Sequence, residues 1–122
     1  MIIGTDDSEK LAGTADADVI SGRGGADVIR GLRRGDLLYG GLGNDQVRGN
    51  SGDDTLFGNA GDDMIRGGYG RDWLSGGHGN DLLFVADGQA DIVDCGGGQD
   101  IVYYDETLDH FSRNCEAFVI TP

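Results

Sequence analysis

The sequence has little positive charge, with 9 Lys and Arg against 22 Asp and Glu in 122 residues and a formal net charge of −13. A nucleic-acid-binding protein needs a basic surface, so this balance argues against a nucleic-acid partner. The sequence also lacks any apolar run near the ~18 residues of a membrane span. No signal peptide precedes the first repeat, so we expect a removed signal, another export route, or a fragment of a longer chain.

Histidine and cysteine are also scarce, with two of each. The loops hold no cluster of these residues, so a zinc site is not expected. His78 lies in an expected turn and His110 near the carboxyl end, with no nucleophile or orienting group at a recognisable spacing. A glycosidase-like carboxylate pair is also disfavoured, because the carboxylates recur along the chain instead of forming one unique pair. We therefore predict that the chain is not an enzyme.

What the sequence does contain is glycine and aspartate at fixed intervals. An Asp recurs every nine residues, with a Gly five residues before it and an aliphatic residue two residues after it, at Asp18, Asp27, Asp36, Asp45, Asp54, Asp63, Asp72 and Asp81. The unit reads Gly-x-x-Gly-x-Asp-x-aliphatic-x, as in Gly40–Arg48. A short fixed period of this kind predicts a single solenoid domain.

Each position of the unit has an expected role. The last three positions alternate outward, inward and outward, as in a short β-strand, and the middle one is aliphatic. The first six form a turn, where glycine adopts backbone angles closed to other residues. Two units make one coil of eighteen residues, and successive coils stack roughly 4.8 Å apart. The predicted core is one file of aliphatic residues from Leu11 to Val102.

This stacking brings carboxylates of successive coils close together, and they need a counter-charge to remain ionised. Ca²⁺ is the expected counter-ion, because it takes six to eight oxygen ligands in flexible geometry, whereas Mg²⁺ demands a near-octahedral site. The alternative is a metal-free solenoid in which Asn and Asp simply suit tight turns, but that alternative does not explain an Asp fixed at one position. With 24 glycines to order and a thin core, we expect Ca²⁺ binding to supply much of the folding free energy.

These units resemble the RTX (hemolysin-type) calcium-binding nonapeptide repeat. Eight run without a gap from Gly13 to Phe84, a degenerate unit with Glu9 at the Asp position precedes them, and two more follow a one-residue insertion. The resemblance implies an all-β, right-handed parallel β-roll over residues 1–104 that holds several Ca²⁺ ions between the turns of adjacent coils.

The resemblance also implies the ligands. Each ion takes the position-six Asp and backbone carbonyls from two loops that are eighteen residues apart. The pairs that fit best are Asp45 with Asp63, Asp54 with Asp72, Asp63 with Asp81, and Asp27 with Asp45. The implied glycine ligands are Gly41, Gly43, Gly52, Gly61, Gly70 and Gly79, and the remaining candidate carboxylates are Asp18, Asp36, Asp91 and Asp100.

Two stretches depart from the pattern. The loop Gly31–Asp36 carries Arg33 and Arg34, and Arg34 stands where the pattern has glycine. Two cations oppose ion binding there, or an Arg replaces the ion by pairing with the carboxylates. After Asp81 the insertion changes the spacing, so the pattern does not carry over unchanged to the last two pairs, Asp72 with Asp91 and Asp81 with Asp100.

The carboxyl end is similar to the ends of secreted actinobacterial RTX-like calcium-binding proteins, through Asp94–Asp100 and Arg113–Glu116. This similarity implies a Cys95–Cys115 disulfide that ties a cap of residues 105–122 to the last coil. A solenoid end needs such a cap, because its strand edge is otherwise unpaired. A disulfide indicates an oxidising, extracellular setting. The alternative is two buried free thiols.

The two outer faces are expected to differ. One carries Arg30, Arg48 and Arg66 beside Val28, Gln46, Met64 and Leu82. Either this arginine column binds an anionic glycan or phosphate, or its counter-charge is only the nearby loop carboxylates. The other is apolar, with Val19, Leu37, Thr55, Trp73 and Ile92 beside Tyr39 and Phe57.

The apolar face marks a protein partner or a homodimer, unless it reflects only the residues that strands prefer. No outward Thr column supports ice binding. The functions left open are a stand-alone Ca²⁺-folded module, an adhesive or self-associating module, and the folding and secretion tail of a larger secreted enzyme.

Overall fold

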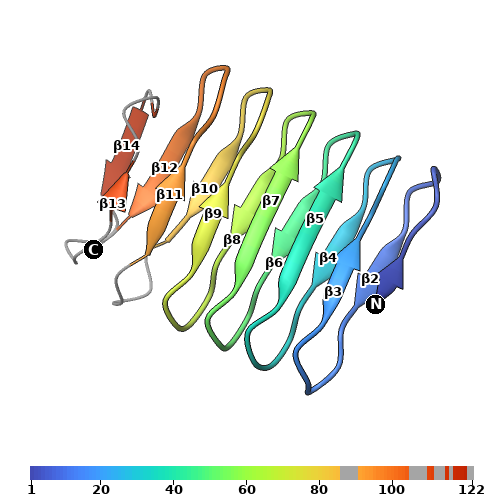
Figure 1. Ribbon diagram of the computed structural model, residues 1–122. Helices are drawn as coiled ribbons and strands as arrows, with labels where there is room; N and C mark the ends of the chain where they lie inside the picture. Colours follow the sequence, from blue (N-terminus) through green and yellow to red (C-terminus); the bar gives the residue numbers. More distant parts are fainter. Residues whose placement is uncertain (86–90, 105–109, 112–114, 116, 121–122) are drawn as a thin grey trace.

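The chain forms a stack of flattened coils built from short parallel strands (Figure 1). The computed structural model describes residues 1–85, 91–104, 110–111, 115 and 117–120. Within these residues there are strands and loops but no helix, so no helix there has the length and apolarity to span a membrane. The predicted all-β parallel solenoid is confirmed.

The strands belong to two seven-stranded sheets that pack against each other with the core between them. The odd-numbered sheet contains β1 (Ile2–Ile3), β3 (Val19–Ser21), β5 (Leu37–Gly41), β7 (Thr55–Asn59), β9 (Trp73–Ser75), β11 (Ile92–Asp94) and β13 (His110–Phe111). The even-numbered sheet contains β2 (Lys10–Ala12), β4 (Val28–Arg30), β6 (Gln46–Arg48), β8 (Met64–Arg66), β10 (Leu82–Phe84), β12 (Ile101–Tyr104) and β14 (Ala117–Ile120).

The strand register follows the sequence period. Val47 pairs with Ile65, and Leu56 pairs with Leu74, each eighteen residues further along the chain. After the insertion the offset becomes nineteen, as for Leu83 with Val102, but the inward and outward faces are kept. The extra residue is therefore absorbed between β10 and β11, and the stack of coils continues across it.

The core lies between the two sheets as two facing columns of aliphatic side chains. The odd-numbered sheet contributes Ile20, Leu38, Leu56, Leu74 and Val93, and the even-numbered sheet contributes Ile29, Val47, Ile65, Leu83 and Val102, each at most 1% exposed. Leu11 and Ile2 pack against one end of these columns. The predicted core residues are confirmed, but they form two facing columns and not one file, and Val85 and Cys95 join them in addition.

The loops between the sheets run along two edges of the roll (Figure 1). We call the edge made by residues 4–9, 22–27, 40–45, 58–63, 76–81 and 95–100 the first edge. The second edge is made by residues 13–18, 31–36, 49–54 and 67–72 and, in the last coil, by Asp91. All the predicted calcium ligands fall on these two edges.

At the carboxyl end, β13 and β14 pair with β11 and β12, so each sheet gains one more strand. Of the expected cap, residues 105–109, 112–114, 116 and 121–122 lie outside the described residues. Cys95 and Cys115 form a disulfide, as the sequence predicts, with their Cα atoms 5.1 Å apart.

Candidate metal centre

Aspartates of successive coils are linked by hydrogen bonds along each edge. The main-chain N–H of one Asp donates to Oδ1 of the Asp one coil further on, for example from Asp45 to Asp63 at 2.8 Å. The first edge links Glu9, Asp27, Asp45, Asp63, Asp81 and Asp100 in this way. The second edge links Asp18, Asp36, Asp54, Asp72 and Asp91.

The two stretches that depart from the sequence pattern keep this arrangement. Asp36, in the arginine-containing loop, still donates its N–H to Asp54 Oδ1 at 2.8 Å. Across the insertion, the N–H groups of Asp72 and Asp81 still donate to Oδ1 of Asp91 and Asp100. The last two pairs are therefore brought together like the others.

The second carboxylate oxygen is the unusual feature of these ladders. Oδ2 is buried and accepts no hydrogen bond from the described residues in Asp27, Asp36, Asp45, Asp54, Asp63 and Asp81. A buried oxygen of this kind normally costs ~1–3 kcal/mol, and more when it is charged. A column of such oxygens needs a proton or a cation.

Carbonyl oxygens lie close to these Oδ2 atoms. A Cβ placed on Gly22 would lie 2.5 Å from Asp27 Oδ2 and 2.6 Å from the carbonyl oxygen of Gly40 in the next coil. At Gly58 the same point lies 2.5 Å from Asp63 Oδ2 and 2.8 Å from the Gly76 carbonyl oxygen. Glycine at the first position of the unit therefore keeps open a space lined by a carboxylate oxygen and a carbonyl oxygen.

The surroundings of these carboxyl groups favour the protonated form when no cation is present. Burial raises the pKa of Asp45, Asp54 and Asp81 to about 7 and that of Asp63 to about 8. Neighbouring carboxylates raise these pKa values further, while hydrogen bonds from the main chain oppose the rise. Burial also raises the pKa of Asp27 and Asp36.

The first two loops are built differently. Thr14 N–H donates to Asp18 Oδ2 at 2.6 Å, and Thr5 N–H donates to Glu9 Oε1 at 2.5 Å. Each Thr hydroxyl also accepts the N–H of the residue two further on. Asp18 is only partly buried, and the chain satisfies its second oxygen, so the predicted ligand Asp18 differs from the later aspartates.

The later loops share a left-handed backbone at their second and fourth positions. All six predicted glycine ligands have positive φ, from 91° at Gly41 to 105° at Gly61. A Cβ at Gly61 would run into the carbonyl of Gly43, and one at Gly79 would run into the carbonyl of Gly61. The fourth-position carbonyls thus form a column beside each carboxylate ladder.

The arginine-containing loop keeps this backbone although its side chains differ. Arg34 has a φ of 67°, and a Cβ at Gly52 would meet the Arg34 carbonyl group. Arg33 and Arg34 are exposed, and no ion pair joins either to a carboxylate of the described residues. The loop therefore keeps its oxygens in place, at the cost of a strained non-glycine residue.

The donor set fits a hard cation with many oxygen ligands. Carboxylate and carbonyl oxygens of neighbouring loops face one another, and Ca²⁺ binds such groups in flexible geometry. Within the described ranges no three carboxylate, imidazole or thiolate side chains converge on one point. An ion between two coils would therefore use a pair of carboxylates and take its other ligands from main-chain carbonyls.

The chain is a parallel β-solenoid whose two edges are lined by carboxylate and carbonyl oxygens. These features are those of a metal-binding β-solenoid protein. A profile of the RTX calcium-binding nonapeptide repeat (4 copies) matches residues 3–33, 31–65 and 57–90, which together span more than half of the 122 residues. The chain belongs to this family, and its repeats form a calcium-binding β-roll. A search of curated proteins gave no match.

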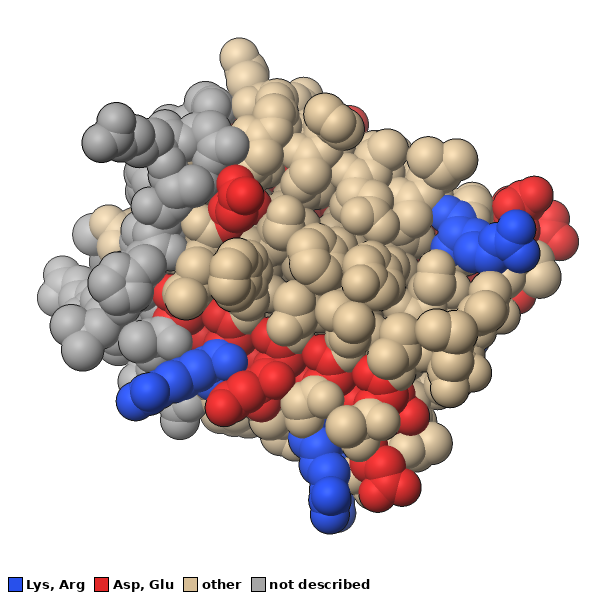
Figure 2. Space-filling model, in the orientation of Figure 1, with Lys and Arg blue, Asp and Glu red and all other residues tan. Residues whose placement is uncertain are grey.

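The two outer faces have the residues that the period predicts. On the even-numbered sheet Arg30, Arg48 and Arg66 are direct register partners, and Arg66 stacks on the Phe84 ring at 4.5 Å. On the odd-numbered sheet no outward side chain of β3, β5, β7 or β9 is charged, and Figure 2 shows this face as a continuous uncharged area above a line of acidic residues.

Sequence reasoning missed a second, outer ladder on the first edge. Asp62 N–H donates to Asn44 Oδ1, and Asn80 N–H donates to Asp62 Oδ1, at 2.8 and 2.7 Å. Gln99 N–H continues the ladder to Asn80 Oδ1. The signal was present in the sequence as Asn and Asp one residue before the repeated Asp, where their short side chains reach a neighbouring backbone.

Proposed function

We propose that the chain is a calcium-dependent folding module that acts outside the cell and has no catalytic activity. The observation that carries the proposal is the set of buried Oδ2 atoms of Asp27, Asp36, Asp45, Asp54, Asp63 and Asp81, which accept no hydrogen bond from the described residues. At neutral pH these oxygens oppose folding unless a cation neutralises them. Ca²⁺ supplies that charge and links neighbouring coils.

The residues that would hold the ions are those of two loops that follow each other along one edge. The Asp pairs contribute carboxylate oxygens, and glycines such as Gly43 and Gly61 contribute carbonyls. The metal-binding free energy becomes folding free energy, because the unfolded chain holds no such arrangement of ligands. The thin core and the 24 glycines leave the metal-free chain little other stabilisation.

Two observations support an extracellular location. Proteins with RTX repeats are typically secreted, and this chain has the repeat. The Cys95–Cys115 disulfide is of a kind that persists in oxidising environments and is rare in the cytosol. Free Ca²⁺ is also abundant enough outside cells to fill weak sites, which occur in extracellular modules at Kd values of about 10⁻⁴–10⁻³ M.

Far-UV circular dichroism of metal-stripped protein during a Ca²⁺ titration tests the proposal, with Mg²⁺ as the control ion. We expect a cooperative coil-to-β transition with Ca²⁺ and none with Mg²⁺. A β spectrum that is unchanged by chelation would contradict it, because the solenoid would then stand without metal.

A second function, self-association through the odd-numbered sheet, is favoured by the exposure of its side chains. Ile3, Trp73 and Ile92 are 57%, 50% and 46% exposed, and the rings of Tyr39 and Phe57 stack beside them at 5.1 Å. Light scattering of the Ca²⁺-loaded chain and of Trp73→Ser tests it, with Leu82→Ser on the other sheet as the control. A monomer in all three samples would rule it out.

A further inference from the structure

Cys95 occupies the first position of its loop, which is glycine in every earlier loop of the first edge. In the loops that begin at Gly22, Gly40, Gly58 and Gly76, a Cβ at the first position would meet the Oδ2 of the loop's own Asp at 2.5 to 2.8 Å. The loop that ends at Asp100 begins with Cys95. A side chain is therefore present where the interior coils keep an open space.

The Cys95 backbone nevertheless continues the column of oxygens. A Cβ at Gly76 would lie 2.6 Å from both Asp81 Oδ2 and the Cys95 carbonyl oxygen. In the coil before, Gly58 has the same relation to Asp63 Oδ2 and the Gly76 carbonyl. The Cys95 carbonyl thus replaces a glycine carbonyl opposite Asp81. The space between the loops of Asp81 and Asp100 therefore has the same pair of carboxylate and carbonyl oxygens as the earlier coils.

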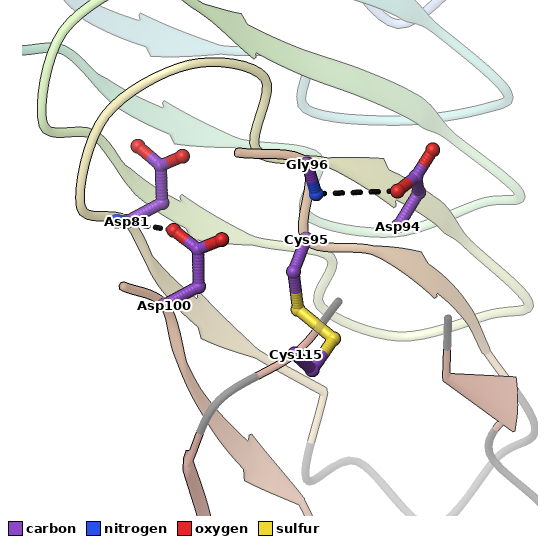
Figure 3. The surroundings of a disulfide bond; sticks show 6 residues. All are labelled: Asp81, Asp94, Cys95, Gly96, Asp100 and Cys115. Carbon is purple, nitrogen blue, oxygen red and sulfur yellow. Dashed lines mark hydrogen bonds between the residues drawn. A yellow bond between two sulfur atoms is a disulfide. The ribbon is translucent and has the colours of Figure 1, made fainter. Parts of the chain in front are cut away.

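The outer side of the same loop is closed by the disulfide. Cys95 is fully buried, and its Cα lies 5.1 Å from that of Cys115, which is close to the spacing of neighbouring strands. Figure 3 shows the Cys95 side chain directed at Cys115 beside the carboxylates of Asp81 and Asp100, whose loops are joined by the Asp81 N–H bond to Asp100 Oδ1 at 2.8 Å.

We propose that the Cys95–Cys115 disulfide ends the ion column of the first edge and holds its last site, between the loops of Asp81 and Asp100, in a binding geometry. Cys95 is a positioning residue, since its carbonyl faces the site while its side chain fixes the loop. This inference rests on the proposed function. Reduction of the disulfide weakens the last site and leaves the sites between Asp27 and Asp81 unchanged.

The matched comparison is between the oxidised chain and the Cys95→Ser/Cys115→Ser chain, which still has a main-chain carbonyl at residue 95 but loses the cross-link. Ca²⁺ binding by isothermal titration calorimetry should show one class of site weakened about 10- to 100-fold, the usual effect of removing a group that orients a ligand. Asp100→Asn in the oxidised chain should remove the same class. Asp100→Asn added to the serine variant should remove the weakened class of site and leave the other sites unchanged.

The outcomes separate this inference from the proposed function. Equal Ca²⁺ binding by the oxidised and serine chains would overturn the inference and leave the proposed function standing. A uniform weakening of every site would also overturn it, because the disulfide would then act only on global stability. No Ca²⁺ binding by either chain would overturn the proposed function itself, and the inference with it.

Discussion

The first two loops and the later loops differ in how the repeated carboxylate is hydrogen-bonded. In both, the main-chain N–H of the repeated acidic residue donates to Oδ1 of the Asp one coil further on. In the first two loops an N–H of the same loop, from Thr5 or Thr14, donates to the carboxylate of Glu9 or Asp18. In the later loops Oδ2 is buried and accepts no hydrogen bond from the described residues in Asp27, Asp36, Asp45, Asp54, Asp63 and Asp81. The first arrangement is complete without metal, and the second is not.

The difference begins with local sequence. Thr at the second position caps its own turn through its hydroxyl. Asp7 and Asp16 stand where the later loops have a left-handed residue, which is Arg34 in one loop and glycine in the others. From Arg23 onward, described second-position residues have positive φ, as at Asn50 and Gly77. The left-handed backbone directs the fourth-position carbonyls toward the carboxylate ladder. The later loops therefore have carbonyl oxygens beside the ladder where the first two loops have a hydrogen-bonded turn.

The largest expected effect is that of removing one carboxylate from the middle of the first edge. Asp63→Asn takes away a charge that two neighbouring coils share, so the Ca²⁺ midpoint of folding should rise at least about tenfold. Asp18→Asn, in a loop that satisfies its own carboxylate, should change the midpoint little. Circular dichroism during Ca²⁺ titration measures both, and equal shifts would remove the distinction between the two kinds of loop.

A methyl group in the open space should be nearly as damaging. In Gly58→Ala the new Cβ meets Asp63 Oδ2 and the Gly76 carbonyl, and overpacking of this kind costs ~1–3 kcal/mol. Gly97→Ala is the matched control, because its Cβ meets only His78 Nδ1 at 3.7 Å. Thermal unfolding in saturating Ca²⁺ should show a clear loss for the first variant only. A loss of similar size in Gly97→Ala would mean that glycine content, and not the oxygen-lined space, is what matters.

The pH dependence of the metal-free chain should be opposite to ordinary acid denaturation. The folded-state pKa values of about 7 for Asp45, Asp54 and Asp81, and about 8 for Asp63, exceed the ordinary value of 3.8. Folding therefore takes up protons, so its stability is fully present below pH ~4 and is lost as the pH rises to ~8. Circular dichroism of metal-stripped protein should show more β-structure at pH 4 than at pH 8. Added Ca²⁺ should restore that structure at pH 8, and the opposite pH trend would contradict the account.

The smallest expected effect is at the strained arginine of the second edge. Arg34→Gly relieves a left-handed non-glycine residue, which costs roughly 1–2 kcal/mol, and removes a cation beside the ladder. We expect a more stable Ca²⁺-loaded chain and a lower Ca²⁺ midpoint. Arg33→Gly removes an equal charge without relieving positive φ, so it should lower the midpoint less. Equal changes would assign the whole effect to charge.

The period of the sequence predicted most of the fold, because every unit places its aliphatic residue and its Asp in the same register. It predicted the aliphatic core residues from Leu11 to Val102 and the edge position of all candidate ligands. It did not predict that Asp81 and Asp100 stay in register across the insertion, since a period alone cannot tell where an extra residue is absorbed. It also kept Asp18 among the candidate ligands without foreseeing that Thr14 bonds its carboxylate, because that hydrogen bond depends on backbone angles that the repeat pattern does not contain.

The most direct test is a crystallographic anomalous difference map of the chain grown in Ca²⁺. The account predicts peaks between consecutive loops of the first edge from Asp27 to Asp100, and of the second edge from Asp36 onward. It predicts no peak enclosed within the hydrogen-bonded turns of Thr5–Glu9 and Thr14–Asp18. Ions held only at exposed carboxylates outside the ladders, or an ordered roll with no ions at these edges, would contradict the claim that Ca²⁺ neutralises the buried carboxylates.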